Sequence, residues 1–328
     1  MVEPTAELSS RQYTVAIAIP TFKRVPQLTH LLQELDQLDN SSVAPLFAVG
    51  VLVVDNDPQQ SAWALCADRP GVRYVSEPRP GIAAARNRAM EEAGTDLLVF
   101  IDDDERPDKA WLAALLAAWS VSGSAAVAGR VVAVFQDALD PWLEAGDFWE
   151  RPSMPTGTCV PVAASGNLLL DLRQIHLRGV RFDERFALGG GEDVAFTRDL
   201  VRAGGRITWC DESIAYDPVP AQRATRRWIF ERAWSQGSIR AAVDLRERAG
   251  WRATPARVAM AGRGAVRVVA GLARAAMGFA LSSPRHQGRG LCTALRGAGM
   301  VAGSAGHLHQ EYAARRASTA PLNEQDGR

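Results

Sequence analysis

Residues 96–105 read DLLVFIDDDE, in which an apolar run ends abruptly in four carboxylates. A short continuous apolar run bounded by polar residues is typical of a strand that is buried on both faces of a sheet. Two similar runs precede it, YTVAIAI at residues 13–19 and VGVLVV at residues 49–54. We expect these three runs to form the centre of one sheet.

Helical segments separate the predicted strands. Within residues 25–38, leucines recur at the spacing of one helix face, and residues 82–93 and 110–119 also have helical patterns. Strands that alternate with helices form a parallel sheet covered on both faces, so the sequence predicts an α/β fold. Further helices are predicted at residues 255–281 and 291–316.

Polar residues stand where each of the three runs ends. Pro20 and Thr21 follow the first run, Asp55 follows the second, and the acidic cluster follows the third. Because ligands of parallel sheets bind at the carboxyl ends of the strands, we expect these residues to converge on one binding edge.

The acidic cluster has two interpretations. Neighbouring carboxylates repel one another unless a cation or hydrogen bonds offset their charge. Mg²⁺ and Mn²⁺ suit such oxygen ligands and bind through one or two carboxylates together with substrate phosphates. The alternative is a solvated acidic loop that caps the next helix. Asp55 likewise either accepts hydrogen bonds from a base or ribose, or makes a turn with Pro58.

Two glycine-containing segments carry further candidates. In RPGIAAARN at residues 79–87, Gly81 permits close backbone approach, and Arg86 and Asn87 can donate to an anion or a base edge. The alternative is an ordinary exposed arginine. In GGGED at residues 189–193, Asp193 is either an N-terminal helix residue or a general base for an acceptor hydroxyl.

Five stretches follow one another along the chain: VAIAIPTFKR, VLVVDND, GIAAARNRAM, LLVFIDDDE and FDERFALGGGEDVAFTRDLVRAGGRI. In this order and approximate spacing the chain resembles family-2 glycosyltransferases of the GT-A fold. The resemblance covers residues 13–215 and extends more loosely to Gly237. It implies a Rossmann-like, mostly parallel central sheet, here followed by a helical C-terminal extension.

The resemblance also implies roles for individual residues. Seven are expected to bind the nucleotide-sugar: Pro20, Thr21, Arg24, Asp55, Arg86, Asp102 and Asp103. Asp104, the second acid of the D-x-D motif, is expected to bind Mn²⁺ or Mg²⁺ beside the donor diphosphate. Asp193 is the expected catalytic base, and Glu192 the catalytic-site acid that helps to position donor or acceptor.

The chain departs from the family pattern at one place. Many relatives carry a His after the strand that follows the acidic helix, whereas this chain reads YDPVP at residues 216–220. Asp217 is the candidate replacement as a metal or diphosphate contact. Trp228 and Arg232 lie four residues apart on a predicted helical face, which either contacts donor or acceptor or packs against the core.

The charge of the chain is uneven although the net charge is zero. Residues 251–328 contain eleven arginines and three acidic residues. Arginine-rich amphipathic helices predicted in this region can lie on an anionic membrane surface. The alternative is a helical extension that packs on the core and turns its arginines to solvent. Nucleic-acid binding is not expected, because this region has few aromatic residues and no recognised binding motif.

The sequence also predicts a localisation and domain limits. The chain has widely spaced cysteines, no evident signal peptide and no uninterrupted apolar run long enough to span a membrane. These features predict a cytoplasmic protein. Peripheral attachment to the inner face of the plasma membrane is a further candidate. We expect a flexible N-terminus (1–12), a catalytic domain (13–222) with a nucleotide-binding half (13–120) and an acceptor half (121–222), a helical basic region (223–316) and a disordered tail (317–328).

The sequence thus predicts an inverting glycosyltransferase. The donor is a UDP- or dTDP-sugar, and the acceptor is a hydroxyl of a glycan, a lipid-linked saccharide or a secondary metabolite. Two alternatives are a catalytically inactive nucleotide-binding or interaction protein, and a sugar-nucleotide pyrophosphorylase. The latter would need a Gly-rich, basic signature near the first strand, where this chain has PTFKR at residues 20–24.

Overall fold

The computed structural model describes residues 11–186, 190–246 and 254–307, which form two compact units. The first unit comprises Met1–Ala138, Trp149–Arg185 and Glu192–Ala221, and the second comprises Leu139–Phe148, Phe186–Gly191 and the chain from Gln222 onward. The predicted tail at residues 317–328 lies outside the described residues. The domain limits given above stay predictions.

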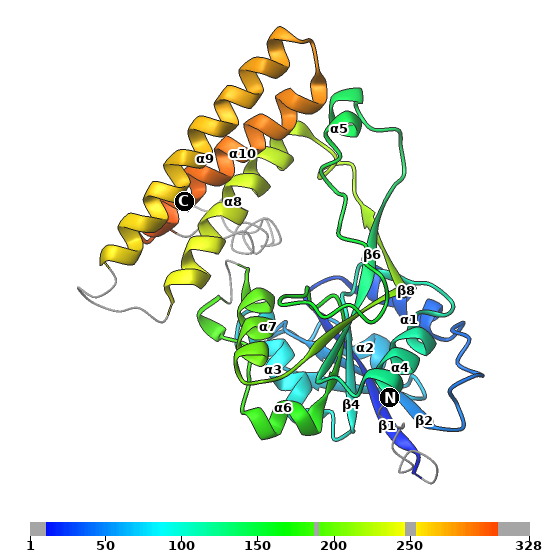
Figure 1. The fold of residues 1–328 in the computed structure, drawn as a ribbon. Helices are drawn as coiled ribbons and strands as arrows, with labels where there is room; N and C mark the ends of the chain where they lie inside the picture. The colour runs from blue at the N-terminus through cyan, green and yellow to red at the C-terminus, as the bar shows by residue number, and fades with distance from the viewer. Residues whose placement is uncertain (1–10, 187–189, 247–253, 308–328) are drawn as a thin grey trace, which may run out of the picture. The chain divides into compact units, whose positions relative to one another are not determined.

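An eight-stranded sheet organises the first unit (Figure 1), with the strand order β3-β2-β1-β4-β7-β6-β8-β5. The strands are β1 (Tyr13–Thr21), β2 (Phe47–Asp55), β3 (Val72–Ser76), β4 (Leu97–Ile101), β5 (Arg106–Pro107), β6 (Ala126–Phe135), β7 (Asn167–Asp171) and β8 (Ile207–Val219). Strands β3, β2, β1 and β4 run parallel, whereas β7 is antiparallel to both of its neighbours. The α/β class is confirmed, with the parallel order concentrated in the N-terminal half.

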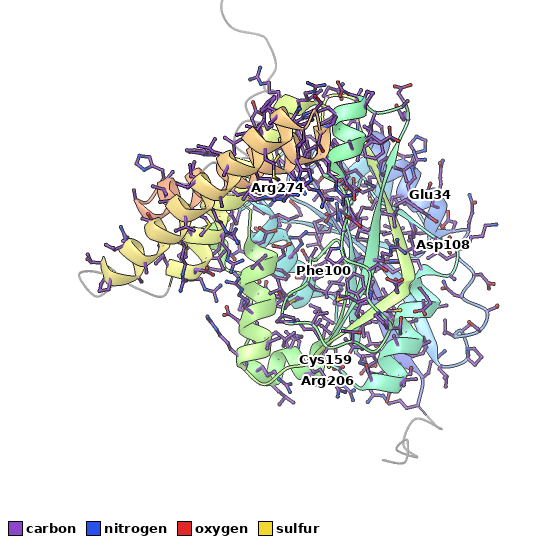
Figure 2. The ribbon with its side chains drawn as sticks, turned by 45° about the horizontal axis from the view of Figure 1, so that its top comes forward. Glu34, Phe100, Asp108, Cys159, Arg206 and Arg274 are labelled. Carbon is purple, nitrogen blue, oxygen red and sulfur yellow. The ribbon has the colours of Figure 1, made fainter. Side chains whose placement is uncertain are left out.

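Helices cover both faces of this sheet. They are α1 (Val25–Leu35), α2 (Trp63–Cys66), α3 (Ile82–Glu92), α4 (Trp111–Ser122), α6 (Leu172–Arg178) and α7 (Glu192–Arg202). Alternate residues of β4 face opposite sides, as the pleat requires. Phe100 (Figure 2) belongs to the core shared with α3, α6 and α7, whereas Val99 belongs to the core shared with α1, α2 and α4.

The second unit is helical and contains α5 (Pro141–Gly146), α8 (Arg226–Leu245), α9 (Thr254–Ala280) and α10 (Pro284–Ser304). The sequence placed the last helix at residues 291–316, but it begins at Pro284, a residue favoured in the first helical turn, and ends at Ser304. Gly288 and Gly290, which are poor helix formers, hid its start. None of the described helices is long and apolar enough to cross a membrane.

Candidate active site

The ends of the central strands meet as predicted. Thr21 at the end of β1 is in register with Asp55 at the end of the parallel strand β2. The Thr21 hydroxyl donates a hydrogen bond of 2.8 Å to Asp103, which follows β4. The carboxyl edge of the sheet therefore gathers the polar residues of all three strands.

Arg24 offsets much of the charge of the acidic cluster. Its guanidinium donates to Asp103 at 2.7 Å and pairs with Asp104 at 2.9 Å. Asp103 is buried, and this burial raises its pKa to about 6 against the lowering influence of Arg24. Asp103 is thus tied to the protein, whereas the side chains of Asp102 and Asp104 stay 40% and 27% exposed. The alternative of a wholly solvated acidic loop is wrong.

Arg86 joins two acidic groups that are far apart in the sequence. One of its terminal nitrogens donates to Glu192 at 2.6 Å, and the other donates to Asp102 at 3.1 Å. Its side chain is only 5% exposed, so the alternative of an ordinary exposed arginine is wrong. A single buried cation therefore holds the acid after β4 beside the acid that begins α7.

Glu192 and Asp193 lie in the first turn of α7. Burial, together with repulsion from Asp193, raises the pKa of Glu192 to about 7, and its Oε2 has no hydrogen-bond partner among the described residues. Desolvation also raises the pKa of Asp193, and its carboxylate accepts the backbone N–H of Val194 at 2.6 Å. Both groups are therefore easier to protonate than ordinary surface carboxylates.

Asp55 is fully buried and already bonded within the protein. It accepts hydrogen bonds from the backbone N–H groups of Asp57 and Ala62 and from the Tyr74 hydroxyl. It therefore shapes the loop that follows β2, and its contact with a nucleotide stays a prediction. Pro20, buried in β1 next to Val54, has no backbone N–H to donate, so its polar contribution is limited to its carbonyl oxygen.

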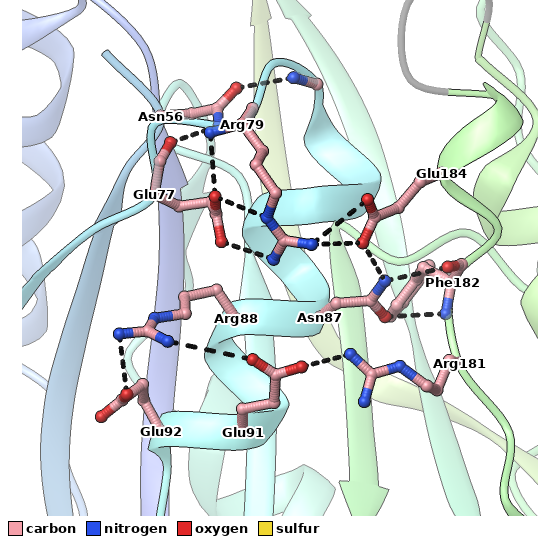
Figure 3. Close-up of polar contacts among 11 residues, drawn as sticks. Asn56, Glu77, Arg79, Asn87, Arg88, Glu91, Glu92, Arg181, Phe182 and Glu184 are labelled. Atoms are coloured by element: carbon pink, nitrogen blue, oxygen red, sulfur yellow. Dashed lines mark hydrogen bonds and ion pairs between the residues drawn. The ribbon is translucent and has the colours of Figure 1, made fainter. Parts of the chain in front are cut away.

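A second polar network fixes the segment that leads to α7 (Figure 3). The sequence offered Asn87 as a donor to a ligand, but its amide donates to the Phe182 carbonyl at 2.9 Å and accepts the Phe182 N–H at 2.9 Å. Arg79 bridges Glu77 at 2.7 Å and Glu184 at 3.1 Å. Asn87 is thus a structural residue that bonds this segment to α3.

Glu105 and Gly166 are site residues that the sequence analysis did not single out. Burial and repulsion from Asp102 raise the pKa of Glu105 well above its ordinary value, and its Oε2 has no hydrogen-bond partner among the described residues. A Cβ at Gly166 would lie 2.8 Å from Glu105 Oε1 and 3.1 Å from Asp102 Oδ2. The acidic run predicted a charged loop, but no local sequence pattern marked Gly166 as the residue that packs against its carboxylates.

Asp217, the candidate replacement for the family His, lies close enough to this site to act on it electrostatically. It accepts a 2.6 Å hydrogen bond from Arg151 and repels Glu105. Trp228 and Arg232 belong to α8 in the second unit, where the Arg232 guanidinium stacks 4.8 Å from the centre of the Trp228 ring. Their contacts with donor or acceptor stay predictions.

The carboxylates of the acidic cluster suit a metal ion whose ligands include substrate phosphates better than one held by protein side chains alone. Within residues 11–186, 190–246 and 254–307, no group of three or more His, Cys, Asp and Glu side chains could hold a metal ion. Mg²⁺-like ions need only one or two carboxylates when phosphate oxygens complete their shell. The partly exposed Asp102 and Asp104 meet that requirement.

Comparison with known proteins identifies the family. Residues 16–161 match the model of glycosyl transferase family 2. The chain is 31% identical over 319 residues to the succinoglycan biosynthesis protein ExoM of Rhizobium meliloti (strain 1021). The aligned region covers 93% of this chain and 98% of that protein. The chain belongs to glycosyl transferase family 2. It is therefore a glycosyltransferase that uses a nucleotide-sugar donor, and the pyrophosphorylase alternative is set aside.

Other relatives agree with this assignment. The pre-mycofactocin glycosyltransferase of Mycobacterium tuberculosis (strain ATCC 25618 / H37Rv) is 33% identical over 169 residues, which are 48% of this chain and 34% of that protein. S. aureus TarS 1-349 in complex with UDP-GlcNAc has a TM-score of 0.50 at 14% identity, over 84% of this chain and 89% of that one. GalNAc-T7 with UDP, GalNAc and Mn²⁺ has a TM-score of 0.52 at 12% identity, and the match covers 71% of this chain and 51% of that one. The structural likenesses confirm the GT-A fold.

Proposed function

We propose that this glycosyltransferase inverts the anomeric centre of its donor sugar and extends a saccharide chain. The observation that supports the proposal is the Arg86 bridge, which holds Asp102, an acid after β4, beside the acidic pair of α7. A leaving diphosphate and an attacking hydroxyl need such neighbouring groups in one site.

In the proposed reaction, Asp193 takes the proton of the acceptor hydroxyl as the oxygen attacks the anomeric carbon. The bond from that carbon to the diphosphate breaks on the opposite side, so a single displacement inverts the configuration. The raised pKa of Asp193 suits a general base, because a base works best when its pKa is near the operating pH. Arg86 holds Glu192 and Asp102 in place around the reacting atoms.

Mn²⁺ or Mg²⁺ is the proposed cofactor, held by Asp104 with Asp102 and by the donor phosphates. When bound, it would supply positive charge against the leaving diphosphate. Arg24 pairs with both Asp103 and Asp104, while the side chains of Asp102 and Asp104 stay partly exposed and so accessible to the ion.

The proposed donor is a UDP-sugar, with a dTDP-sugar as the second candidate. UDP is first because two proteins of similar fold were solved with UDP-GlcNAc or with UDP. The proposed acceptor is a glycan or a lipid-linked saccharide, because the similarity to a succinoglycan biosynthesis protein extends over nearly the whole of both chains. A secondary metabolite is the alternative acceptor.

The test combines turnover with product stereochemistry. The protein is incubated with Mn²⁺, one UDP- or dTDP-sugar at a time, and a panel of synthetic aryl glycosides as acceptors. We expect release of the nucleoside diphosphate and a glycoside whose anomeric configuration, measured by proton NMR, is opposite to that of the donor. A product with retained configuration would contradict the proposed role of Asp193. The absence of turnover despite tight nucleotide binding would favour the inactive binding protein.

A further inference from the structure

Helix α9 has one face buried in the second unit and another face that no other described element of that unit covers. Its buried residues lie three, four or seven positions apart, on one helix face, and pack against α10: Met260, Gly264, Gly271, Ala275 and Gly278. Six of its other large apolar side chains are 46% to 69% exposed: Val258, Val266, Val269, Leu272, Met277 and Phe279. A water-facing helix surface is normally polar opposite its core face.

Helix α9 has four arginines, of which three lie along one edge of the helix and the fourth, the exposed Arg257, lies apart from them. At 3.6 residues per turn, Arg263, Arg267 and Arg274 project within about 40° of one another, between the buried and the exposed apolar faces. Figure 2 labels Arg274 on this helix. Residues 254–307 contain no Asp, Glu or Lys, so nothing within the hairpin of α9 and α10 neutralises these arginines.

We propose that the exposed face of α9 docks on the surface of an anionic lipid bilayer. The helix lies in the plane of the interface, with Val269 and Leu272 among the acyl chains and the arginines at lipid phosphates. It lies there rather than spans, since none of the described helices has the length and hydropathy to cross. At 1.5 Å per residue its contact line is roughly 40 Å long.

Charge favours a bilayer over the other occupants of this face. A second copy would set arginine against arginine with no acidic side chain on either hairpin. The chain's own C-terminal segment, residues 308–328, has only Leu308, Tyr312 and Leu322 as large apolar residues, too few to cover the whole face. An anionic headgroup layer over acyl chains matches both the arginine edge and the apolar face.

The test is flotation of the full-length protein with lipid vesicles. We expect binding to vesicles of phosphatidylcholine and phosphatidylglycerol in equal parts, and little binding to pure phosphatidylcholine. The variant Val269→Asp/Leu272→Asp should lose about tenfold or more in partition coefficient, because two carboxylates enter the apolar face. The matched control is Leu177→Asp on α6, where the side chain is 86% exposed outside this face, and it should bind like wild type.

A second set of variants tests the charge. Replacing Arg263, Arg267 and Arg274 by Gln should abolish the preference for phosphatidylglycerol, and replacing them by Lys should retain it. Wild-type protein that ignores phosphatidylglycerol, or a doubly substituted variant that floats as well as wild type, would overturn the proposal. So would a wild-type dimer in sedimentation that Val269→Asp/Leu272→Asp converts to a monomer, since the face would then belong to a second copy.

Discussion

Arg86 owes its position to the turn that begins α3. Gly81 precedes this helix with φ at 114°, a conformation that side chains with a Cβ rarely adopt, and donates its N–H to Asn56. The helix then packs against β1 and β2, and Arg86, about one and a half turns after Gly81, reaches both Asp102 and Glu192. Local backbone geometry thus decides where the charge of the site is placed.

Asp193 is the residue on which the proposed chemistry depends most. In Asp193→Asn the side chain keeps its shape but no longer accepts a proton. We expect kcat to fall by roughly 10²–10⁴-fold, the usual contribution of a positioned base. The affinity for UDP, measured by calorimetry, should stay within a factor of about two, because the proposed base acts on the acceptor and not on the nucleotide. Turnover near the wild-type rate would remove Asp193 from the mechanism.

Glu192 should make stability depend on pH in a particular direction. Its pKa is raised to about 7 in the folded protein from 4.5, so the folded state holds its proton more tightly than the unfolded chain. This contribution is fully present below pH 4.5 and is lost as the pH rises through 7. Glu192→Gln does not titrate there.

From about pH 5 to pH 8, the free energy of unfolding of wild type should therefore fall by about 1–3 kcal/mol relative to that of Glu192→Gln. Urea unfolding of both proteins at the two pH values measures the change. A difference between the two proteins that is independent of pH would show that Glu192 does not titrate in this range.

Among the elements, the helices of the second unit approach one another closely at glycines. A Cβ at Gly237 on α8 would lie 2.1 Å from the carbonyl oxygen of Arg296 on α10, whereas one at Gly262 on α9 would meet nothing within 4 Å. The same substitution should thus have opposite effects at the two positions.

Gly237→Ala should destabilise the second unit by about 1–3 kcal/mol, because the helices must separate. Gly262→Ala should stabilise it by about 0.5–1 kcal/mol, because alanine loses less backbone entropy in a helix. Thermal unfolding followed by circular dichroism at the helix band compares the two. Equal effects of the same sign would mean that α8 and α10 are not in backbone contact.

The sequence predicted the elements whose signal is local. Strands β1, β2 and β4 are continuous apolar runs, and their ends were placed within a few residues. Strand β8 extends to Val219 without such a local signal, because its charged and partly exposed second half is held by pairing with β6. Likewise, the strand-end positions were predictable, whereas the bonds of Arg24 to Asp103 and of Asn87 to Phe182 depend on folding of distant segments.

For the whole molecule, the two proposed activities reside in different units. The groups around Arg86 belong to the first unit, and the apolar face of α9 belongs to the second. We expect Val269→Asp/Leu272→Asp to bind nucleotide like wild type in calorimetry, and Asp104→Ala to float with anionic vesicles like wild type. Failure of the vesicle proposal would then leave the proposed transfer reaction untouched, and the reverse also holds.

The most direct test of the account is calorimetric titration of the whole protein with UDP, dTDP and GDP, in Mn²⁺ or Mg²⁺ and then in EDTA. Wild type, Asp104→Ala and the exposed control Asp68→Ala are compared. We predict that one nucleotide binds only with the metal, that Asp104→Ala loses this binding, and that Asp68→Ala keeps it. Binding that is unchanged by EDTA or by Asp104→Ala would contradict a metal-assisted donor site at the acidic cluster.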